Sequence, residues 1–490
     1  MSVSSASSAS SSLTPSSYPN QGLIVMGTGP ESGINYTAIL NALDKALSAP
    51  ITMMQAQETP LNNQLTAWQA IGSDISTLSS SAAALGQPSL FQSYTATSSD
   101  TSVATAQASS SAIPGTYNVT VSSLATTGVI ASQQGVAATS TAVASSGSTG
   151  TFNITVNGNT TDVALNSTTG YTLADLAQTI NNSNAGVTAS IINNGATSDP
   201  YQLVLTSNNT GTNYAPSVTD NLTGGTSLTF TTTQSAANAK LSYEGISITS
   251  QSNTVKNVIP GVTLSLASTG STTITVGLDT QTIDNAVSSF ISAYNKVIGD
   301  VSAQNTVTSS GSGNTKSETL GPLGGNVSLT NLVNNLYSFI GSEAPGLSGN
   351  AGLASTYGIT QSSSGSGKLQ LNASALNNML TSDPQQVQQY LSALVNGSPS
   401  ADGASQPGGM TNFLNTYTNS ANGVVQFSEA QINTQLTNMN NQIAQMQANV
   451  QTQMGMYTKE FSNLESYIGQ MQTTNSALTS SIKQMIAQGA

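Results

Sequence analysis

The stretch that decides the fold is residues 429–486, which begins EAQINTQLTNMNNQIAQMQANV at Glu429 and ends LTSSIKQMI at Ile486. Its apolar residues recur at steps of three and four, with Asn475 as the one polar residue in the pattern, which places them in one stripe along a helix that needs a partner helix. The stripe comprises Ile432, Leu436, Met439, Ile443, Met446, Val450, Met454, Tyr457, Phe461, Leu464, Ile468, Met471, Leu478, Ile482 and Met485. An unbroken helix of this length would extend roughly 85 Å at 1.5 Å per residue. We therefore expect a stalk rather than a core helix.

A second helical region lies near the N-terminus. Its apolar residues also have helical spacing, whereas Pro50 and Pro60 predict an interruption between two leg helices. We expect the seam of this region to include Leu47, Ile51, Leu61, Leu65 and Trp68. We interpret Trp68 as a core aromatic, and a ligand platform is the less favoured alternative.

From Pro88 onward the pattern changes to the alternation of apolar and polar residues that is typical of strands. Residues 151–156 alternate and lead into Asn157-Gly158, which is a strong hairpin signal. A short helix is predicted at 171–181, with Thr172 as its N-cap. Further strands are predicted at 117–121, 187–192, 201–206, 245–249, 262–267 and 272–278.

The helical spacing returns at Ile283 and persists to Val301. Beyond it, Asp383 and Pro384 predict the capped start of another helix. Between these two helices we expect a loop at 306–315, a helix at 329–340 and a strand at 368–371. After the second helix we expect a joint at 407–409.

The composition excludes several classes of function. The 490 residues include no Cys and no His, which rules out disulfides, thiolate metal sites and the commonest general base. Only 6% of the residues are charged, against roughly 25% in an ordinary protein, and the net charge is −12. A basic surface for nucleic acid is therefore missing. No apolar run is long enough for a membrane span, and residues 1–14 do not resemble a Sec signal peptide.

The two helical ends share one seam pattern, so the economical arrangement pairs them and loops out the strands as a head. We predict an α+β multidomain fold, with a coiled-coil-like helical leg formed by both chain ends and an inserted, mainly antiparallel β head of two subdomains. The expected parts are a disordered segment 1–35, leg helices 36–87, a head subdomain 88–128 and 240–282, an inserted outer head subdomain 129–239, a helical leg domain 283–406 and a C-terminal coiled-coil helix 407–490.

Several blocks of sequence resemble one family, the flagellar filament capping proteins, also called flagellar hook-associated protein 2. The blocks are SLFQSYTATSSDTSVATAQASSSAIPGTY (89–117), YTLADLAQTINNSNAGVTASI (171–191), IPGVTL (259–264), FISAYN (290–295), GPLGGN (321–326) and FSNLESYIGQMQTTNSALTSSI (461–482). They cover nearly the whole chain in order. The chain departs from the family on its end helices, where Asn, Gln and Ser replace many charged residues.

The resemblance implies a homo-oligomeric plate of about five subunits at the distal tip of the flagellar filament. Such a cap promotes flagellin polymerisation and prevents the loss of exported monomers. The implied partners are further copies of the chain, flagellin, the hook-filament junction protein, a cytoplasmic export chaperone and the flagellar export apparatus. The implied route is flagellar type III export to the cell exterior. The seam residues of both ends, from Leu47 to Trp68 and from Ile432 to Met485, are then the candidates for oligomerisation and filament docking.

We expect no enzyme, no cofactor and no metal, because no serine or carboxylate stands in a recognisable catalytic context. The alternatives are another flagellar axial protein, such as flagellin or a hook-associated protein, or a secreted adhesin. Adhesion by the head is also compatible with a cap as a second role.

The head should fold without the leg, because residues 88–280 contain the predicted strands and lack the seam helices. We expect this fragment to be a β-rich monomer, whereas the full chain self-associates. Circular dichroism and sedimentation of both would check this. A fragment with the oligomeric state of the full chain would show that the leg is not the assembly device.

Overall fold

The computed structural model of the chain describes residues 29, 32–148, 150–164, 170–222, 226–310, 317–362, 367–397 and 408–488. Their contacts divide the chain into two units. Within the described residues, the first unit contains those up to 79, 293–338 and 412–488, and the second contains 80–292 and 339–411. The predicted leg domain 283–406 is therefore divided, because its described residues from 339 to 397 belong to the second unit.

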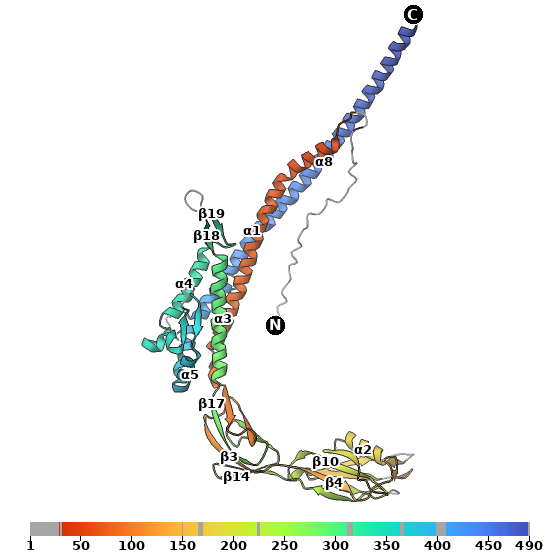
Figure 1. Cartoon of the computed structure of the whole chain (residues 1–490), viewed down its shortest axis with the longest axis vertical. Helices are drawn as coiled ribbons and strands as arrows, with labels where there is room; N and C mark the ends of the chain where they lie inside the picture. The colour runs from red at the N-terminus through yellow and green to blue at the C-terminus, as the bar shows by residue number, and fades with distance from the viewer. Residues whose placement is uncertain are drawn as a thin grey trace. The chain divides into compact units, whose positions relative to one another are not determined.

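The first unit is built on two long helices, α1 (Tyr36–Leu85) and α8 (Val424–Gln488), which lie side by side in Figure 1. The prediction that Pro50 and Pro60 break the first helix is wrong, since α1 runs through both. A proline inside a helix costs roughly 3 kcal/mol. Both rings are exposed, while Ile51 and Trp68 are buried nearby, so tertiary packing holds the helix in spite of the prolines.

The predicted C-terminal helix 407–490 is two helices rather than one. Pro407 lies outside the described residues, α7 (Met410–Thr418) follows, and α8 begins after a turn. In that turn the side chain of Asn419 accepts hydrogen bonds from the backbone amides of Ala421 and Asn422, which ends the helical run.

The remaining elements of the first unit come from the middle of the chain. They are α3 (Thr280–Gln304), which starts in the second unit, the hairpin strands β18 (Val307–Ser310) and β19 (Ser317–Leu320), and α4 (Val327–Gly341). The predicted loop 306–315 is thus wrong at its start, where Val307 pairs with Leu320. Val and Thr favour strands, and the Ser- and Gly-rich residues after them obscured this signal.

The inner head subdomain has two antiparallel sheets around one core. The order is β1-β17-β3-β13-β14 in one sheet and β15-β16-β2 in the other. The strands are β1 (Tyr94–Ser98), β2 (Ala104–Ala108), β3 (Gly115–Ser123), β13 (Ala239–Tyr243), β14 (Ile246–Ser250), β15 (Thr254–Lys256), β16 (Val262–Leu266) and β17 (Gly270–Leu278). Their core draws on residues 103–125 and 239–276, on both sides of the insertion.

The outer head subdomain has its own core, drawn from residues 130–228. Its sheets have the orders β12-β4-β10-β9, β11-β6-β7 and β5-β8. The elements are β4 (Thr127–Ser132), β5 (Ala142–Ala144), β6 (Thr151–Val156), β7 (Asn159–Ala164), β8 (Tyr171–Thr172), α2 (Leu173–Asn182), β9 (Val187–Asn193), β10 (Tyr201–Thr210), η2 (Thr212–Tyr214), β11 (Ser217–Asp220) and β12 (Phe230–Gln234). The predicted hairpin is confirmed: Val156 pairs with Asn159, and Asn157 and Gly158 both have positive φ.

The rest of the second unit is helical, with one small hairpin. Its elements are η1 (Pro88–Gln92), η4 (Gly349–Gly352), η5 (Ala354–Tyr357), β20 (Ile359–Gln361), β21 (Leu369–Leu371), α5 (Ala373–Ser382) and α6 (Pro384–Asn396). The predicted cap of α6 is confirmed, since the Asp383 side chain accepts from the amide of Gln386 at 3.0 Å. The rings of Tyr357 and Tyr390 stack at 4.2 Å in this core. The predicted fold class, with helical ends and an inserted antiparallel head, is confirmed.

The start of α2 provides a test of carboxylate capping. The Thr172 hydroxyl donates to Asp175 at 2.7 Å, and this bond holds the pKa of the carboxyl below its ordinary value of 3.8. Because the folded-state pKa is lowered, the stabilisation is present above pH 3.8 and is lost as the pH falls through the folded pKa. In the fragment 88–280, Asp175→Asn should reduce the free energy of unfolding by about 0.3–1 kcal/mol at pH 7.

Urea unfolding followed by tyrosine fluorescence measures this difference, which should shrink as the pH falls below 3.8. Asp162→Asn, at an exposed strand position of the same subdomain, is the matched control. A penalty at Asp175 that persisted undiminished at the lowest pH would contradict the capping argument.

Candidate docking site on the last helix

Two contacts fix how α1 and α8 pair. At one end, the rings of Tyr36 and Phe461 lie 5.2 Å apart. At the other end, Val425 lies against Gly72: a Cβ atom placed on Gly72 would be only 2.8 Å from the Val425 side chain. The start of α1 therefore meets the later part of α8, and the two helices are antiparallel.

The middle of this seam is closed by apolar side chains. Ile51 of α1 and Ile443 and Val450 of α8 form a buried cluster. The half-buried residues around it are Leu47, Met54, Met439, Met446 and Met454. Unbranched methionine side chains fill irregular gaps, which suits a seam whose apolar spacing changes where two steps of four follow each other, from Met446 to Val450 and on to Met454.

The seam ends at a buried carboxylate that the sequence did not indicate. Glu465 is only 8% exposed. It accepts hydrogen bonds from the backbone amide of Ser32 at 3.0 Å and from the Tyr36 hydroxyl at 2.9 Å. A buried carboxylate is stable only when such donors surround it. Gly29 and Ser32 thus contact α8, although they fall within the segment 1–35 that was predicted to be disordered.

The structure divides the predicted docking residues into three groups. It buries Ile51, Trp68, Ile432, Ile443 and Val450. It half-buries Leu47, Leu61, Leu65, Leu436, Met439, Met446, Phe461 and Ile468. It leaves exposed Leu464, Met471, Leu478, Ile482 and Met485. The first two groups hold the leg together, while a docking role for any of them stays a prediction.

The exposed group continues the seam pattern from Leu464 onward, where α1 no longer accompanies α8. Together with the half-buried Ile468, it forms the distal stripe: Leu464, Ile468, Met471, Leu478, Ile482 and Met485. Leu478 is 59% exposed and Ile482 43% exposed. Their spacing keeps them on one face of the helix. An apolar stripe of this length that remains open to water marks an interaction surface.

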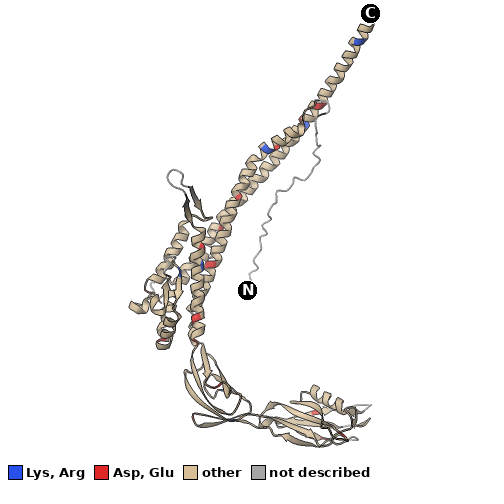
Figure 2. Ribbon diagram, viewed as in Figure 1, with Lys and Arg blue, Asp and Glu red and all other residues tan. Residues whose placement is uncertain are grey.

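The surroundings of the stripe carry almost no charge, and Figure 2 shows how few charged residues occur in the described part of the chain. From residue 466 to the end of α8, Lys483 is the one charged side chain. Polar residues such as Gln470, Thr473 and Ser480 cover the opposite face. A partner therefore meets apolar and uncharged groups, so burial rather than charge attraction would supply the binding energy.

A second feature that the sequence did not indicate is a cluster of charged side chains between α1 and α3. The Lys296 ammonium lies 3.0 Å from the Asp74 carboxylate and 2.7 Å from that of Asp300. Burial raises the pKa of Asp74, and the hydrogen bond from Lys296 opposes that rise. The contacts with Asp300 and Asp74 raise the pKa of Lys296. The cluster ties α3 to α1.

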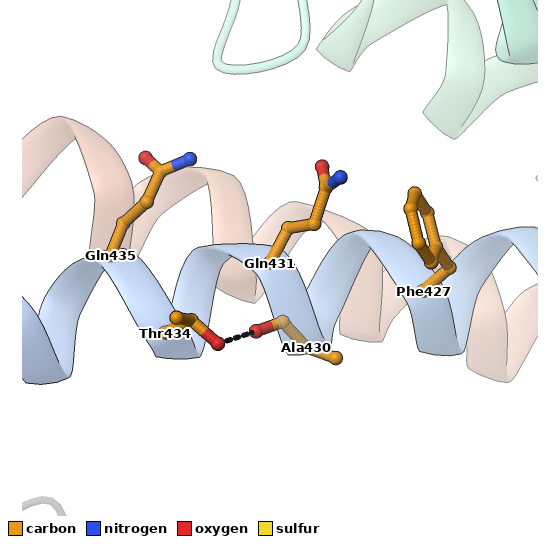
Figure 3. A pocket seen from close by; sticks show the side chains of 5 residues that line it. All are labelled: Phe427, Ala430, Gln431, Thr434 and Gln435. Carbon is orange, nitrogen blue, oxygen red and sulfur yellow. Dashed lines mark hydrogen bonds between the residues drawn. The ribbon is translucent and has the colours of Figure 1, made fainter.

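A shallow groove on the outer face of α8 offers no catalytic chemistry either. Figure 3 shows that it is lined by Phe427, Ala430, Gln431, Thr434 and Gln435. The Thr434 hydroxyl already donates to the Ala430 carbonyl at 2.8 Å. None of these side chains can act as a general base near neutral pH.

A metal-binding cluster and a membrane-spanning helix are both absent from the described part of the chain. It contains no group of three or more acidic, histidine or cysteine side chains that could hold a metal ion. Among its helices, none combines the length and the apolar character that crossing a bilayer requires.

Comparisons with known families agree along the chain. Residues 32–128 match the family described as "Flagellar hook-associated protein 2 N-terminus", and residues 236–473 match "Flagellar hook-associated protein 2 C-terminus". Residues 151–209 match the "Flagellin hook IN motif", a range that includes the whole block 171–191.

Individual relatives cover nearly the full chain. Flagellar hook-associated protein 2 of Escherichia coli K12 is 27% identical over 93% of this chain and 97% of its own length. The A-type flagellar hook-associated protein 2 of Pseudomonas aeruginosa has the same identity and coverage. The crystal structure of the D1-D2-D3 domains of the E. coli flagellar cap protein FliD is similar, with a TM-score of 0.54 and 27% identity. It covers 75% of this chain and 99% of its own.

The contact at Glu465 can be tested by removing one donor. Tyr36→Phe leaves the buried carboxylate without that hydrogen bond, which should lower the free energy of unfolding of the leg by about 1–3 kcal/mol. Trp68 is the single tryptophan and is 3% exposed, so its fluorescence reports the unfolding of the leg.

The matched control is Tyr467→Phe, which removes the same hydroxyl from a side chain that is 61% exposed. We expect the control to stay within about 0.5 kcal/mol of the parent. If both variants lowered the free energy of unfolding equally, the hydrogen bond from Tyr36 to Glu465 would not stabilise the end of the seam.

Proposed function

Because the chain belongs to the flagellar hook-associated protein 2 family, we propose that it is the cap at the distal tip of the flagellar filament. There it promotes flagellin polymerisation and prevents the loss of exported monomers. The observation that supports this role best is the distal stripe, an apolar helix face left open after the seam ends. The two family descriptions that match residues 32–128 and 236–473 are those of hook-associated protein 2, so another axial protein or an adhesin is not favoured.

The cap works as a homo-oligomeric plate of about five subunits whose legs dock on the filament end. Each leg supplies one distal stripe. Fully burying a Leu, Ile or Met side chain contributes about 1.5–3 kcal/mol. Several such side chains per leg hold the plate on the filament without any charge pair.

The further partners follow from this location. Flagellin is the protein that the legs contact, and the hook-filament junction protein is the first surface on which the cap sits. Before export, a cytoplasmic chaperone shields the open stripe and delivers the chain to the flagellar export apparatus. The location is thus extracellular, reached by flagellar type III export. Catalysis has no part in this role.

The stripe also separates docking from folding. Since Leu478 and Ile482 are already exposed in the isolated chain, a charge at either position leaves its folded leg intact. Once docked, the same charges would be buried without a partner, at several kcal/mol each.

Cells that carry Leu478→Asp together with Ile482→Asp should therefore export the protein, shed flagellin monomers into the medium and grow short filaments or none. The measurements are filament length by electron microscopy and the amounts of flagellin and cap protein in the medium. The matched control is Ser476→Asp with Ser480→Asp, which places two charges at the same spacing on the opposite, exposed face. Filaments of normal length in the first variant, with normal export, would reject the docking role of the stripe.

A further inference from the structure

The distal stripe follows a strict heptad repeat, written a to g, in which the seam consists of positions a and d. Ile468 and Ile482 are a positions and carry β-branched side chains. The d positions are Leu464, Met471, Leu478 and Met485. In parallel coiled coils, isoleucine at a with leucine at d favours two strands over three or four. The repeat therefore indicates both the number of helices and their direction.

Asn475 occupies the a position between the two isoleucines and is the one polar residue of the seam pattern. Its side chain is exposed in the single chain. In a parallel pair of identical helices, each a position faces the same a position of the partner, so two Asn475 amides meet and can hydrogen-bond. A slip by one heptad would set each amide against an isoleucine and leave it buried without a partner. Asn475 thus favours a single register.

The same residue disfavours an antiparallel pair. In such a pair position a faces position d, so Asn475 would lie against Leu478. The part of α8 that pairs antiparallel with α1 has only apolar residues in its seam. The polar seam residue thus occurs only where α1 no longer accompanies α8.

Charge does not oppose the pairing of two copies. From residue 466 to the end of α8 the single charged side chain is that of Lys483, at a b position on the outer side of such a pair. The e and g positions that flank the middle of the seam are uncharged: Gln472, Thr474, Thr479 and Ser481. At its two ends, Tyr467 and Ile486 flank the seam and are 61% and 69% exposed, which widens the apolar face.

We propose that two copies of the free chain pair their distal stripes as a parallel two-stranded coiled coil, with Asn475 facing Asn475. The pairing uses the surface that each single chain leaves exposed, so the fold of each leg is unchanged. A seam of about three heptads is short, and small interfaces are typical of transient contacts. The pair does not require the proposed function; under that function, docking exchanges the second copy for the filament.

Engineered cysteines test the pairing in the full chain, which contains no other thiol. Met485→Cys alone should form an intermolecular disulfide under mild oxidation, because a d position faces its own copy in a parallel pair. The matched control is Thr473→Cys, at an exposed f position on the opposite face of the helix. We expect the first variant to cross-link at least about ten-fold faster at equal protein concentration. Equal rates would overturn the proposal and leave the stripe to a different protein.

A mixture of two single-cysteine chains tests the direction of the pair. In a parallel pair, Met485→Cys and Ile468→Cys chains each cross-link to their own kind. In an antiparallel pair, these two positions face each other, so the mixed disulfide would dominate. Mass spectrometry of the cross-linked peptides separates the two results, and a dominant mixed disulfide would overturn the parallel arrangement.

Asn475→Leu tests the register. Without the buried amides, the pair should tighten by at least about ten-fold in dissociation constant and should also slip by one heptad, which brings Met485 opposite Leu478. Mixed Met485→Cys and Leu478→Cys chains should therefore gain mixed disulfide several-fold when both also carry Asn475→Leu. The matched control is Thr473→Leu, which adds the same side chain outside the seam and should leave that disulfide rare. No gain with Asn475→Leu would overturn the role of Asn475 in fixing the register.

Discussion

The structure of the leg depends on apolar burial between α1 and α8. Helices of this length gain most of their stability from packing rather than from intrinsic propensity. This holds strongly for α1, which carries two internal prolines and still runs from Tyr36 to Leu85. Because the seam pairs the helices antiparallel and ends at Glu465, the longer α8 projects beyond its partner. The open stripe is thus a consequence of the staggered pairing, in which α8 continues past the start of α1 while α1 continues past the start of α8.

The helical leg, the inserted head and several caps could be predicted from the sequence, because they depend on local patterns. The steps of three and four around Ile443 identify a seam, and Asp383 before Pro384 identifies a helix start. The pairing register could not be predicted, because the same steps continue past Glu465 into the open stripe. The buried role of Glu465 arises only when Tyr36 and Ser32 arrive from the other end of the chain. The continuity of α1 through Pro50 also depends on tertiary contacts.

The scarcity of charge changes what stabilises the helices. Pairs of Glu and Lys four residues apart, which normally support an exposed helix, are largely replaced by Ser, Thr, Asn and Gln. On α8, Thr434, Thr437 and Thr452 donate their hydroxyls to the carbonyls four residues earlier. Such bonds compete weakly with the helix and do not strengthen it. The seam between the helices consequently bears more of the stability than in a charged leg.

This arrangement assigns stability and docking to different parts of one helix. The cluster around Ile51, Ile443 and Val450 is buried within the chain and is unaffected by what the distal stripe contacts. The stripe residues contribute little to the isolated fold, because Leu478 and Met485 are exposed there. Binding energy gained at the stripe is therefore not needed to keep the leg folded. Under the proposed function, a leg of this kind could leave and regain its place repeatedly, since each release would expose only a surface that already tolerates water.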